Sequence, residues 1–178
     1  MKTLIIVKER EYAWIQDVIP FRHPLLAPVC NKPLLSYWID FAIQCGSREI
    51  RLVSDGPTSE LEKWFGNGNR WGVELTYAPI RETDKLEETL HKNSRFCLQS
   101  RLLVLQGYFF LHYDKGKDYK RFMQAVLPGD MLTCPTGRIL IRDSASAVQS
   151  TPVAASPPLA LVPLRSLNDF HQLSLQIL

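Results

Sequence analysis

The feature that most constrains the fold is a regular alternation of short apolar runs with helical segments over residues 2–143. Strands that alternate with helices in this way form a mainly parallel sheet covered by helices. The pattern therefore predicts an α/β domain. The expected strands are 2–7, 49–55, 73–78, 101–107 and 137–143, and the expected helices are 32–46, 58–66, 82–93 and 117–127.

Two segments near the N-terminus differ in character. We expect residues 8–32 to form a long connection, because Pro20, Pro24 and Pro28 interrupt regular structure. The segment "KPLLSYWIDFAIQCG" follows at 32–46, and its apolar residues cover most of the circumference of a helix. A helix of that kind is buried between layers, so we expect this segment to pack against the sheet.

The composition changes after Asp143. Residues 144–165 begin with a small, polar, proline-bearing stretch, and we expect a linker or loop excursion there. Residues 166–178 predict a C-terminal helix whose apolar face needs a surface to cover. That surface could belong to the α/β domain at 1–143, to a second copy in a homo-oligomer, or to a further domain.

Charge and cysteine content narrow the classes of function. The 178 residues carry a net charge of +3 that is scattered, without the basic run typical of nucleic-acid binding. The four cysteines lack C-x-x-C spacing, which favours free thiols over a metal site. We recognise neither a signal-peptide pattern nor an apolar run of ~20 residues. We therefore expect a cytoplasmic protein that binds neither nucleic acid nor membrane.

Three segments carry motifs in addition to periodicity: "LLAPVCNKPLLSYWIDFAIQCGSREIRLVSD", "LEKWFGNGNRWGVELTYA" and "LLVLQGYFF". Together they resemble the sugar-1-phosphate nucleotidyltransferases, enzymes that join a nucleoside triphosphate to a sugar phosphate. The resemblance covers most of residues 2–114. It implies a Rossmann-like (GT-A-like) three-layer sandwich with a mainly parallel sheet, and an active site over the carboxyl ends of the strands.

The first departure from that family follows the first strand. The family's phosphate loop reads Gly-x-Gly-Thr-Arg, whereas this chain has Glu9, Arg10, Glu11, Tyr12 and Ala13. Glycines let the backbone N–H groups approach a triphosphate closely. Glu9 and Glu11 would instead repel it, at ~1 kcal/mol for unit charges ~4 Å apart in water and several times more near a protein surface.

Three further elements of the family's site are altered. Its phosphate-contacting Lys, in Pro-Lys-Pro, falls on His23 or Pro24, with Arg22 nearby. Its Gly-Asp, which holds Mg²⁺, is Gly107-Tyr108 here, and a tyrosine is a poor Mg²⁺ ligand. Its Gly-Thr-Ala turn corresponds to part of "TDKLEETLHKN", which contains no glycine. The scaffold segments thus remain while four site elements differ.

We therefore interpret the chain as a degenerate nucleotidyltransferase-like domain, a pseudoenzyme with no catalytic residue, no metal ligand and no expected cofactor. It would be a non-catalytic binding, assembly or regulatory module connected with sugar-nucleotide or polysaccharide biosynthesis. The expected small-molecule partner is a sugar nucleotide or sugar phosphate. The candidate pocket residues are Lys8, Arg10, Arg22, Lys32, Asp55, Gly107 and Tyr108.

The alternative is an active sugar-1-phosphate nucleotidyltransferase with altered residues, which would use Mg²⁺ and form an NDP-sugar. In that case four cations would replace the usual phosphate contacts: Lys8, Arg10, Arg22 and Lys32.

Some candidates also have simpler explanations. Lys32 suits a solvated lysine at the start of a helix. Asp55 follows the second strand at the carboxyl edge, where ligands sit, but an Asp-Gly turn explains it equally well. Trp64 and Trp71 could stack on a base or sugar ring, or could pack under the third strand.

Overall fold

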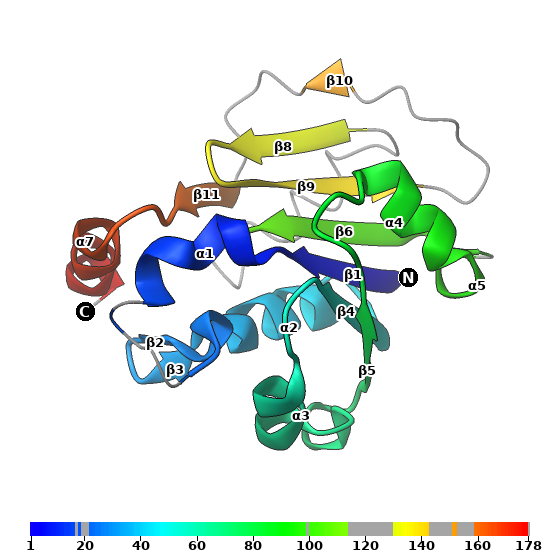
Figure 1. The fold of residues 1–178 in the computed structure, drawn as a ribbon, viewed down its shortest axis with the longest axis horizontal. Helices are drawn as coiled ribbons and strands as arrows, with labels where there is room; N and C mark the ends of the chain where they lie inside the picture. The colour runs from blue at the N-terminus through cyan, green and yellow to red at the C-terminus, as the bar shows by residue number, and fades with distance from the viewer. Residues whose placement is uncertain are drawn as a thin grey trace.

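A seven-stranded sheet with the order β10-β8-β9-β6-β1-β4-β5 forms the centre of the molecule (Figure 1). The computed structural model describes residues 1–16, 18, 22–98, 100–113, 130–142, 151–152 and 159–177. The strands of this sheet are β1 (Lys2–Val7), β4 (Glu49–Ser54), β5 (Glu74–Pro79), β6 (Leu102–Gly107), β8 (Asp130–Cys134), β9 (Gly137–Arg142) and β10 (Thr151–Pro152).

Four neighbouring strands make the parallel part of the sheet. β1 lies between β4 and β6, with Ile5 opposite Leu52 on one side and Leu105 on the other, and β5 pairs with β4. On the far side of β6, β9 runs antiparallel to β6, β8 runs antiparallel to β9, and β10 is parallel to β8. The prediction of an α/β fold with a mainly parallel sheet is confirmed.

Helices cover both faces of the sheet. Alternate residues of a strand point to opposite faces, so β1 contributes Ile5 and Val7 to one apolar cluster and Leu4 and Ile6 to another. The first cluster includes buried residues of α1, α2, α3 and α7, and the second includes those of α4 and α5. The helices are α1 (Glu9–Gln16), α2 (Leu34–Gln44), α3 (Ser59–Phe65), α4 (Leu86–Lys92), α5 (Ser94–Cys97) and α7 (Leu167–Ile177).

Helix α2 is deeply buried, as the sequence predicts. Trp38 and Phe41 have no exposed surface, and the Trp38 indole N–H donates to the carbonyl oxygen of Phe109 at 3.0 Å. Apolar residues around most of the helix thus meet protein on most sides, as expected.

The prediction that residues 8–32 form only a connection is wrong. This stretch contains helix α1, a 3-10 turn η1 (Pro24–Leu26) and the first strand of a short hairpin made of β2 (Pro28–Val29) and β3 (Lys32–Pro33). Helix α1 forms because Tyr12 and Ile15, three residues apart, both pack into the core. Its last residue, Gln16, precedes all three prolines, so none of them interrupts it.

A second, two-stranded sheet pairs β7 (Phe109–Tyr113) with β11 (Leu159–Pro163) in antiparallel register. β11 lies within residues 144–165, where the sequence analysis expected a linker or loop and no strand. Its apolar residues pair with β7, whose Phe109 and Phe110 are buried, which explains why an isolated short apolar run forms a strand. The helix expected at 117–127 lies outside the described residues.

Helix α7 contacts the rest of the chain. Leu173 is almost completely buried, the Phe170 ring lies 6.4 Å from that of Trp14 on α1, and Ser174 approaches Cys30 of the β2–β3 turn. Its apolar face therefore covers part of its own domain. The division into a domain, a linker and a terminal helix stays a prediction.

Candidate ligand site at the carboxyl edge of the sheet

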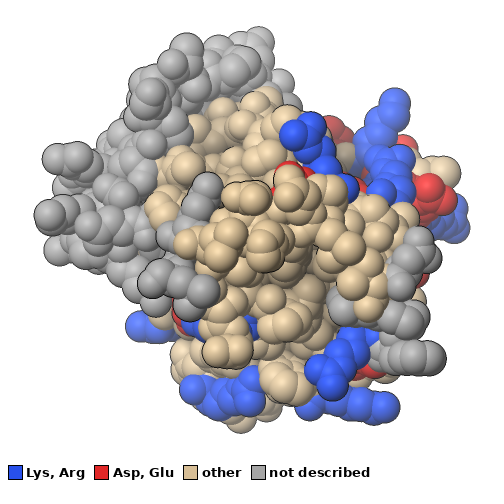
Figure 2. Space-filling view, turned by 90° about the vertical axis from the view of Figure 1, so that its left-hand side faces the viewer, with Lys and Arg blue, Asp and Glu red and all other residues tan. Residues whose placement is uncertain are grey.

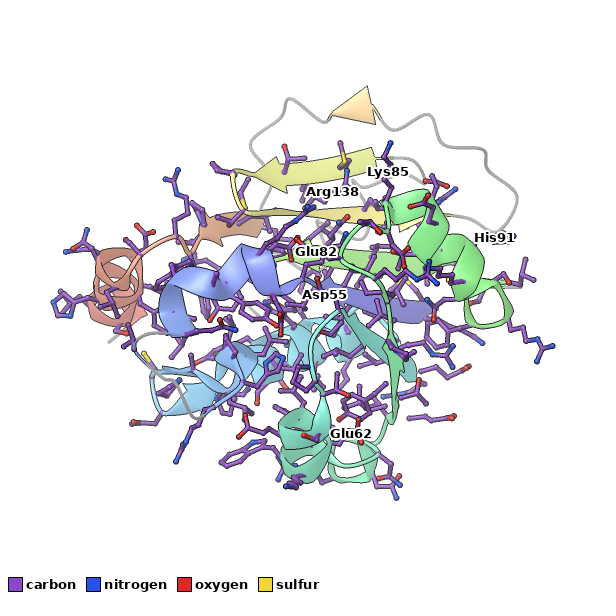
Figure 3. The ribbon with its side chains drawn as sticks, in the orientation of Figure 1. Asp55, Glu62, Glu82, Lys85, His91 and Arg138 are labelled. Atoms are coloured by element: carbon purple, nitrogen blue, oxygen red, sulfur yellow. The ribbon has the colours of Figure 1, made fainter. Side chains whose placement is uncertain are left out.

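Helix α1 begins directly after β1, at the edge of the sheet where the phosphate loop was expected. The first N–H groups of a helix are available to bind an anion. Here the backbone N–H of Lys8 donates to Oε2 of Glu11 at 2.9 Å, and that of Glu9 donates to Oδ1 of Asp55 at 2.8 Å. Two carboxylates of the chain itself therefore occupy this position, and Asp55 lies beside the start of α1 in Figure 3.

Glu9 and Glu11 are held at this turn by their surroundings. A Cβ atom added to Gly56 would lie 2.4 Å from Oε1 of Glu9, so the glutamate packs directly on the bare backbone of that glycine. Burial raises the pKa of Glu11, an effect opposed by its hydrogen bond from Lys8 and by the charge of Arg10. The open backbone that the family uses for phosphate is covered by side chains here.

The Lys8 side chain is turned to the backbone of the loop before α4. It is only 2% exposed, and its Nζ donates to the carbonyl oxygens of Glu82 at 2.6 Å and Asp84 at 2.5 Å. Its ammonium group therefore satisfies buried carbonyls, which is the usual requirement for a buried charge. Glu82, labelled in Figure 3, lies on this loop.

Two other candidate cations lie away from the α1 turn. Lys32 forms an ion pair with Asp40 and lies over the ring of Tyr37, 4.9 Å from its centroid. Arg22 lines a separate cavity between the β2–β3 hairpin and α3. The structure therefore brings Lys8, Arg10 and Asp55 around one turn and leaves these two elsewhere.

Packing in the fold accounts for both Gly107 and Tyr108. Gly107 has a φ of +116°, and a Cβ there would lie 2.1 Å from the carbonyl oxygen of Thr136. A glycine is thus required by the close approach of the β8–β9 turn. Tyr108 is completely buried, and its hydroxyl donates to the carbonyl oxygen of Pro24 at 2.9 Å. Burial raises the pKa of Tyr108, so this phenol stays neutral.

The position that the resemblance assigns to the Mg²⁺ carboxylate therefore does not fit a magnesium ion. Mg²⁺ requires carboxylate or other accessible oxygen ligands, and Tyr108 offers a buried, neutral hydroxyl that already has an acceptor. Within the described ranges, no group of three or more His, Cys, Asp or Glu side chains could hold a metal ion.

A cleft lies next to the α1 turn, beyond the end of β6. It has a volume of about 580 Å³ and is lined by Arg10, Glu11, Gln106, Arg138 and the turn at 133–137. Arg138 Nε donates to Oε1 of Gln106 at 2.8 Å, which orients its guanidinium group. Two guanidinium groups in one cleft suit an anion such as a phosphate.

Arg138 was not identified from the sequence. It lies opposite Gln106 in the β6–β9 pair, and both residues are near the carboxyl end of β6. That antiparallel pairing, which neither local pattern specifies, brings Arg138 to the cleft. The sequence signal that could have found it was a charged residue at the start of an otherwise apolar strand.

The surface seen in Figure 2 carries its charges in separate groups. Uncharged side chains fill the middle of the described part of this face, and Lys and Arg side chains lie in groups around it. Among the described residues, no helix is long and apolar enough to cross a membrane.

The sequence is similar to a curated enzyme over part of its length. No protein-family model matches the chain. A glucose-1-phosphate thymidylyltransferase from Actinoplanes sp. is 25% identical over 100 residues, which is 56% of this chain and 32% of that relative. The matching segment thus spans about a third of the length of the curated relative.

Three solved structures share the fold. A protein named as a glucose-1-phosphate thymidylyltransferase from Bacillus anthracis, in complex with sucrose, superimposes with a TM-score of 0.60 at 17% identity, over 74% of this chain and 54% of that one. A UDP-glucose pyrophosphorylase complexed with UDP-glucose gives 0.54 at 14% identity, over 70% and 52%. A UTP-bound UGPase from Acinetobacter baumannii gives 0.65 at 10% identity, over 99% and 92%.

These similarities confirm the resemblance that the motifs suggested. The sequence match and the superpositions agree with one group of enzymes. The chain has a nucleotidyltransferase-like, Rossmann-like fold and is similar to the sugar-1-phosphate nucleotidyltransferases.

Proposed function

We propose that this chain is a non-catalytic, nucleotidyltransferase-like binding module that acts in assembly or regulation in sugar-nucleotide or polysaccharide biosynthesis. The observation that carries the proposal is the start of α1, where Glu11 and Asp55 accept the N–H groups of Lys8 and Glu9. A triphosphate would have to displace both carboxylates before it could use that backbone.

The electrostatic cost supports the proposal. Unit charges ~4 Å apart interact at about 4 kcal/mol near a protein surface, and the turn presents three carboxylates to an incoming polyphosphate. These belong to Glu9, Glu11 and Asp55. Arg10 lines the adjacent cleft, and Lys8, the other neighbouring cation, has its ammonium group bound to two backbone carbonyls. Repulsion is therefore not offset at this turn by that lysine.

The ligand that we propose is a sugar phosphate or sugar nucleotide bound in the neighbouring cleft. Arg10 and Arg138 supply two positive charges there, and Glu11 supplies one negative charge. A single phosphate group that meets two guanidinium groups gains charge-assisted hydrogen bonds, and the sugar can use the threonine hydroxyls of the turn at 133–137.

Thermal unfolding in the presence of ligands tests this function. A ligand at 100 times its dissociation constant stabilises the folded state by ~2.7 kcal/mol, which is easily detected as a shift in Tm. We expect glucose 1-phosphate or UDP-glucose to raise the Tm, and Arg138→Gln to reduce the shift. Arg95→Gln removes an exposed charge on α5 and is the matched control. A nucleoside triphosphate added with Mg²⁺ and a sugar phosphate should release no pyrophosphate.

The alternative is an active sugar-1-phosphate nucleotidyltransferase with altered residues. The observation that favours it is the match of a UTP-bound UGPase to 99% of this chain. A Mg²⁺-dependent Tm shift with a triphosphate, together with release of pyrophosphate after addition of a sugar phosphate, would establish the alternative and remove the non-catalytic proposal.

We also propose a cytoplasmic location and self-association, or attachment of a further domain, through α7. Leu167 and Leu175 of α7 are 54% and 57% exposed, although Leu173 is buried against the domain. Light scattering of the full chain and of a Leu167→Ser, Leu175→Ser variant tests this. A mass equal to one chain for both proteins would exclude self-association.

A further inference from the structure

A second cavity, of about 410 Å³, lies between the β2–β3 hairpin and helix α3. Its volume is in the range of small-molecule sites. It shares no lining residue with the cleft beside α1, so it is a separate feature. Its apolar surface is formed by Leu26, Pro28 and Pro33, next to the indole of Trp64.

Trp64 of α3 does not pack into the core. Helix α3 buries Leu61 and Phe65 in the core, whereas Trp64 points away from it and is 50% exposed. A large exposed aromatic side chain costs hydrophobic free energy unless something covers it, and it offers a flat surface on which a ring can stack.

Two cations line the same cavity. Lys63 precedes Trp64 on α3, and Arg22 reaches the cavity from the segment before η1. Glu60 of α3 accepts the backbone N–H of His23 at 2.5 Å, which fixes the residue after Arg22 to α3. Neither cation forms an ion pair with a described residue. The net charge of Arg22, Lys63 and Glu60 is positive, so the cavity favours an anion.

We propose that this cavity binds a small phosphate ester that contains a ring, with the ring on Trp64 and the phosphate between Arg22 and Lys63. Stacking on an aromatic side chain tolerates different rings, and a phosphate accepts hydrogen bonds from both cations. Sugar phosphates and nucleoside monophosphates share this chemistry. The site goes beyond the proposed function, because it uses none of the residues of the cleft.

Fluorine NMR of the full chain labelled with 5-fluorotryptophan tests the proposal at a single side chain. The chain has four tryptophans, and the Trp64 signal is assigned by its loss in Trp64→Phe. The probes are glucose 1-phosphate and uridine 5′-monophosphate. The protein carries Arg138→Gln, so that binding in the cleft does not contribute. Trp38, which is completely buried, is the internal control.

We expect a saturable movement of the Trp64 signal, and not of the Trp38 signal, with at least one probe. Lys63→Gln and Arg22→Gln should each raise the Kd about tenfold, a typical loss when a charge-assisted hydrogen bond is removed. Arg95→Gln should leave the Kd unchanged. If both probes move the signal, the cavity recognises the phosphate-ester chemistry that they share. If only one does, the ligand belongs to the class of that probe.

The proposal is overturned if neither probe moves the Trp64 signal at about 10 mM, a concentration that detects even millimolar affinity. It is also overturned if Lys63→Gln and Arg22→Gln leave the Kd unchanged. A negative result at Trp64 does not bear on the ligand proposed for the cleft beside α1. A smaller Tm shift in Arg138→Gln with an intact Trp64 response would separate the two sites.

Discussion

Two adjacent parts of the carboxyl edge of the sheet carry opposite chemistry. At the end of β1, the backbone N–H groups at the start of α1 are bound by Glu11 and Asp55. At the end of β6, Arg10 and Arg138 face a cleft. A few side chains thus decide which charge each part of this sheet edge presents.

The α1 side is closed by aromatic packing as well as by carboxylates. Tyr108 lies 5.9 Å from the Tyr12 ring and 6.2 Å from the Trp14 ring, and Tyr12 lies 5.5 Å from the ring of His23. Rings at these separations pack favourably. The resemblance assigns the family's metal carboxylate to position 108, within this cluster, and an aspartate introduced there would disrupt a core.

The largest effect that we predict is therefore that of Tyr108→Asp. The substitution introduces a carboxylate into a completely buried position and leaves a cavity where the ring was. We expect the free energy of unfolding to fall by at least about 4 kcal/mol. Urea denaturation measures it.

Tyr108→Phe is the matched control for that change. It keeps the ring and removes only the hydrogen bond to Pro24, so we expect a loss of about 1 kcal/mol. If Tyr108→Asp were as stable as Tyr108→Phe, the position would be open to solvent or to a cation, and the comparison between the two parts of the edge would fail.

The next largest effect is a loss of stability at acid pH that depends on His23. Its Nδ1 accepts the backbone N–H of Leu25 at 3.1 Å, and burial lowers its pKa from 6.5 to about 4. The folded state favours neutral His23. The contribution of neutral His23 to the free energy of unfolding is therefore complete above pH 6.5. This contribution is lost as the pH falls toward 4, by up to about 3 kcal/mol.

Chemical denaturation at several pH values measures this contribution. We expect His23→Asn, which keeps an acceptor for the Leu25 N–H, to weaken the dependence of the free energy of unfolding on pH between 6.5 and 4. His91→Gln changes an exposed histidine and should leave the dependence as it is. An unchanged slope in His23→Asn would show that His23 is accessible to protons in the folded state.

The smallest effect concerns the cap of α1. Asp55→Ala removes the acceptor for the Glu9 N–H, and the loss of such a cap costs about 1 kcal/mol. Asp55→Asn keeps an acceptor oxygen and should cost less. Thermal unfolding measures both. Equal stability of Asp55→Ala and the unchanged protein would indicate that the carboxylate does not hold the turn closed.

Most of the scaffold could be predicted from the sequence. Strand β1 and helix α2 bury nearly all of their apolar residues, and burial produces a periodic pattern that can be read locally. Helix α1 was missed because it is short, begins with three charged residues at 9–11, and is followed by the prolines that dominate the stretch.

The site could be predicted only in part. The replacement of glycines by Glu9 and Glu11 is visible in the sequence, but the bond between Glu9 and Asp55 joins residues that only the β1–β4 pairing brings together. The burial of Lys8 depends on the loop that holds Glu82, and the place of Arg138 depends on the register of β9. Such contacts between distant segments leave no local pattern.

The central claim is that the chain's own carboxylates exclude a polyphosphate from the first turn of α1. Amide NMR of the ¹⁵N-labelled chain tests it most directly, with UTP and Mg²⁺ added to about 10 mM, where even weak binding is detected. The account predicts that the amide signals of Lys8 and Glu9 do not move. A saturable movement of both signals, lost with excess EDTA, would contradict it.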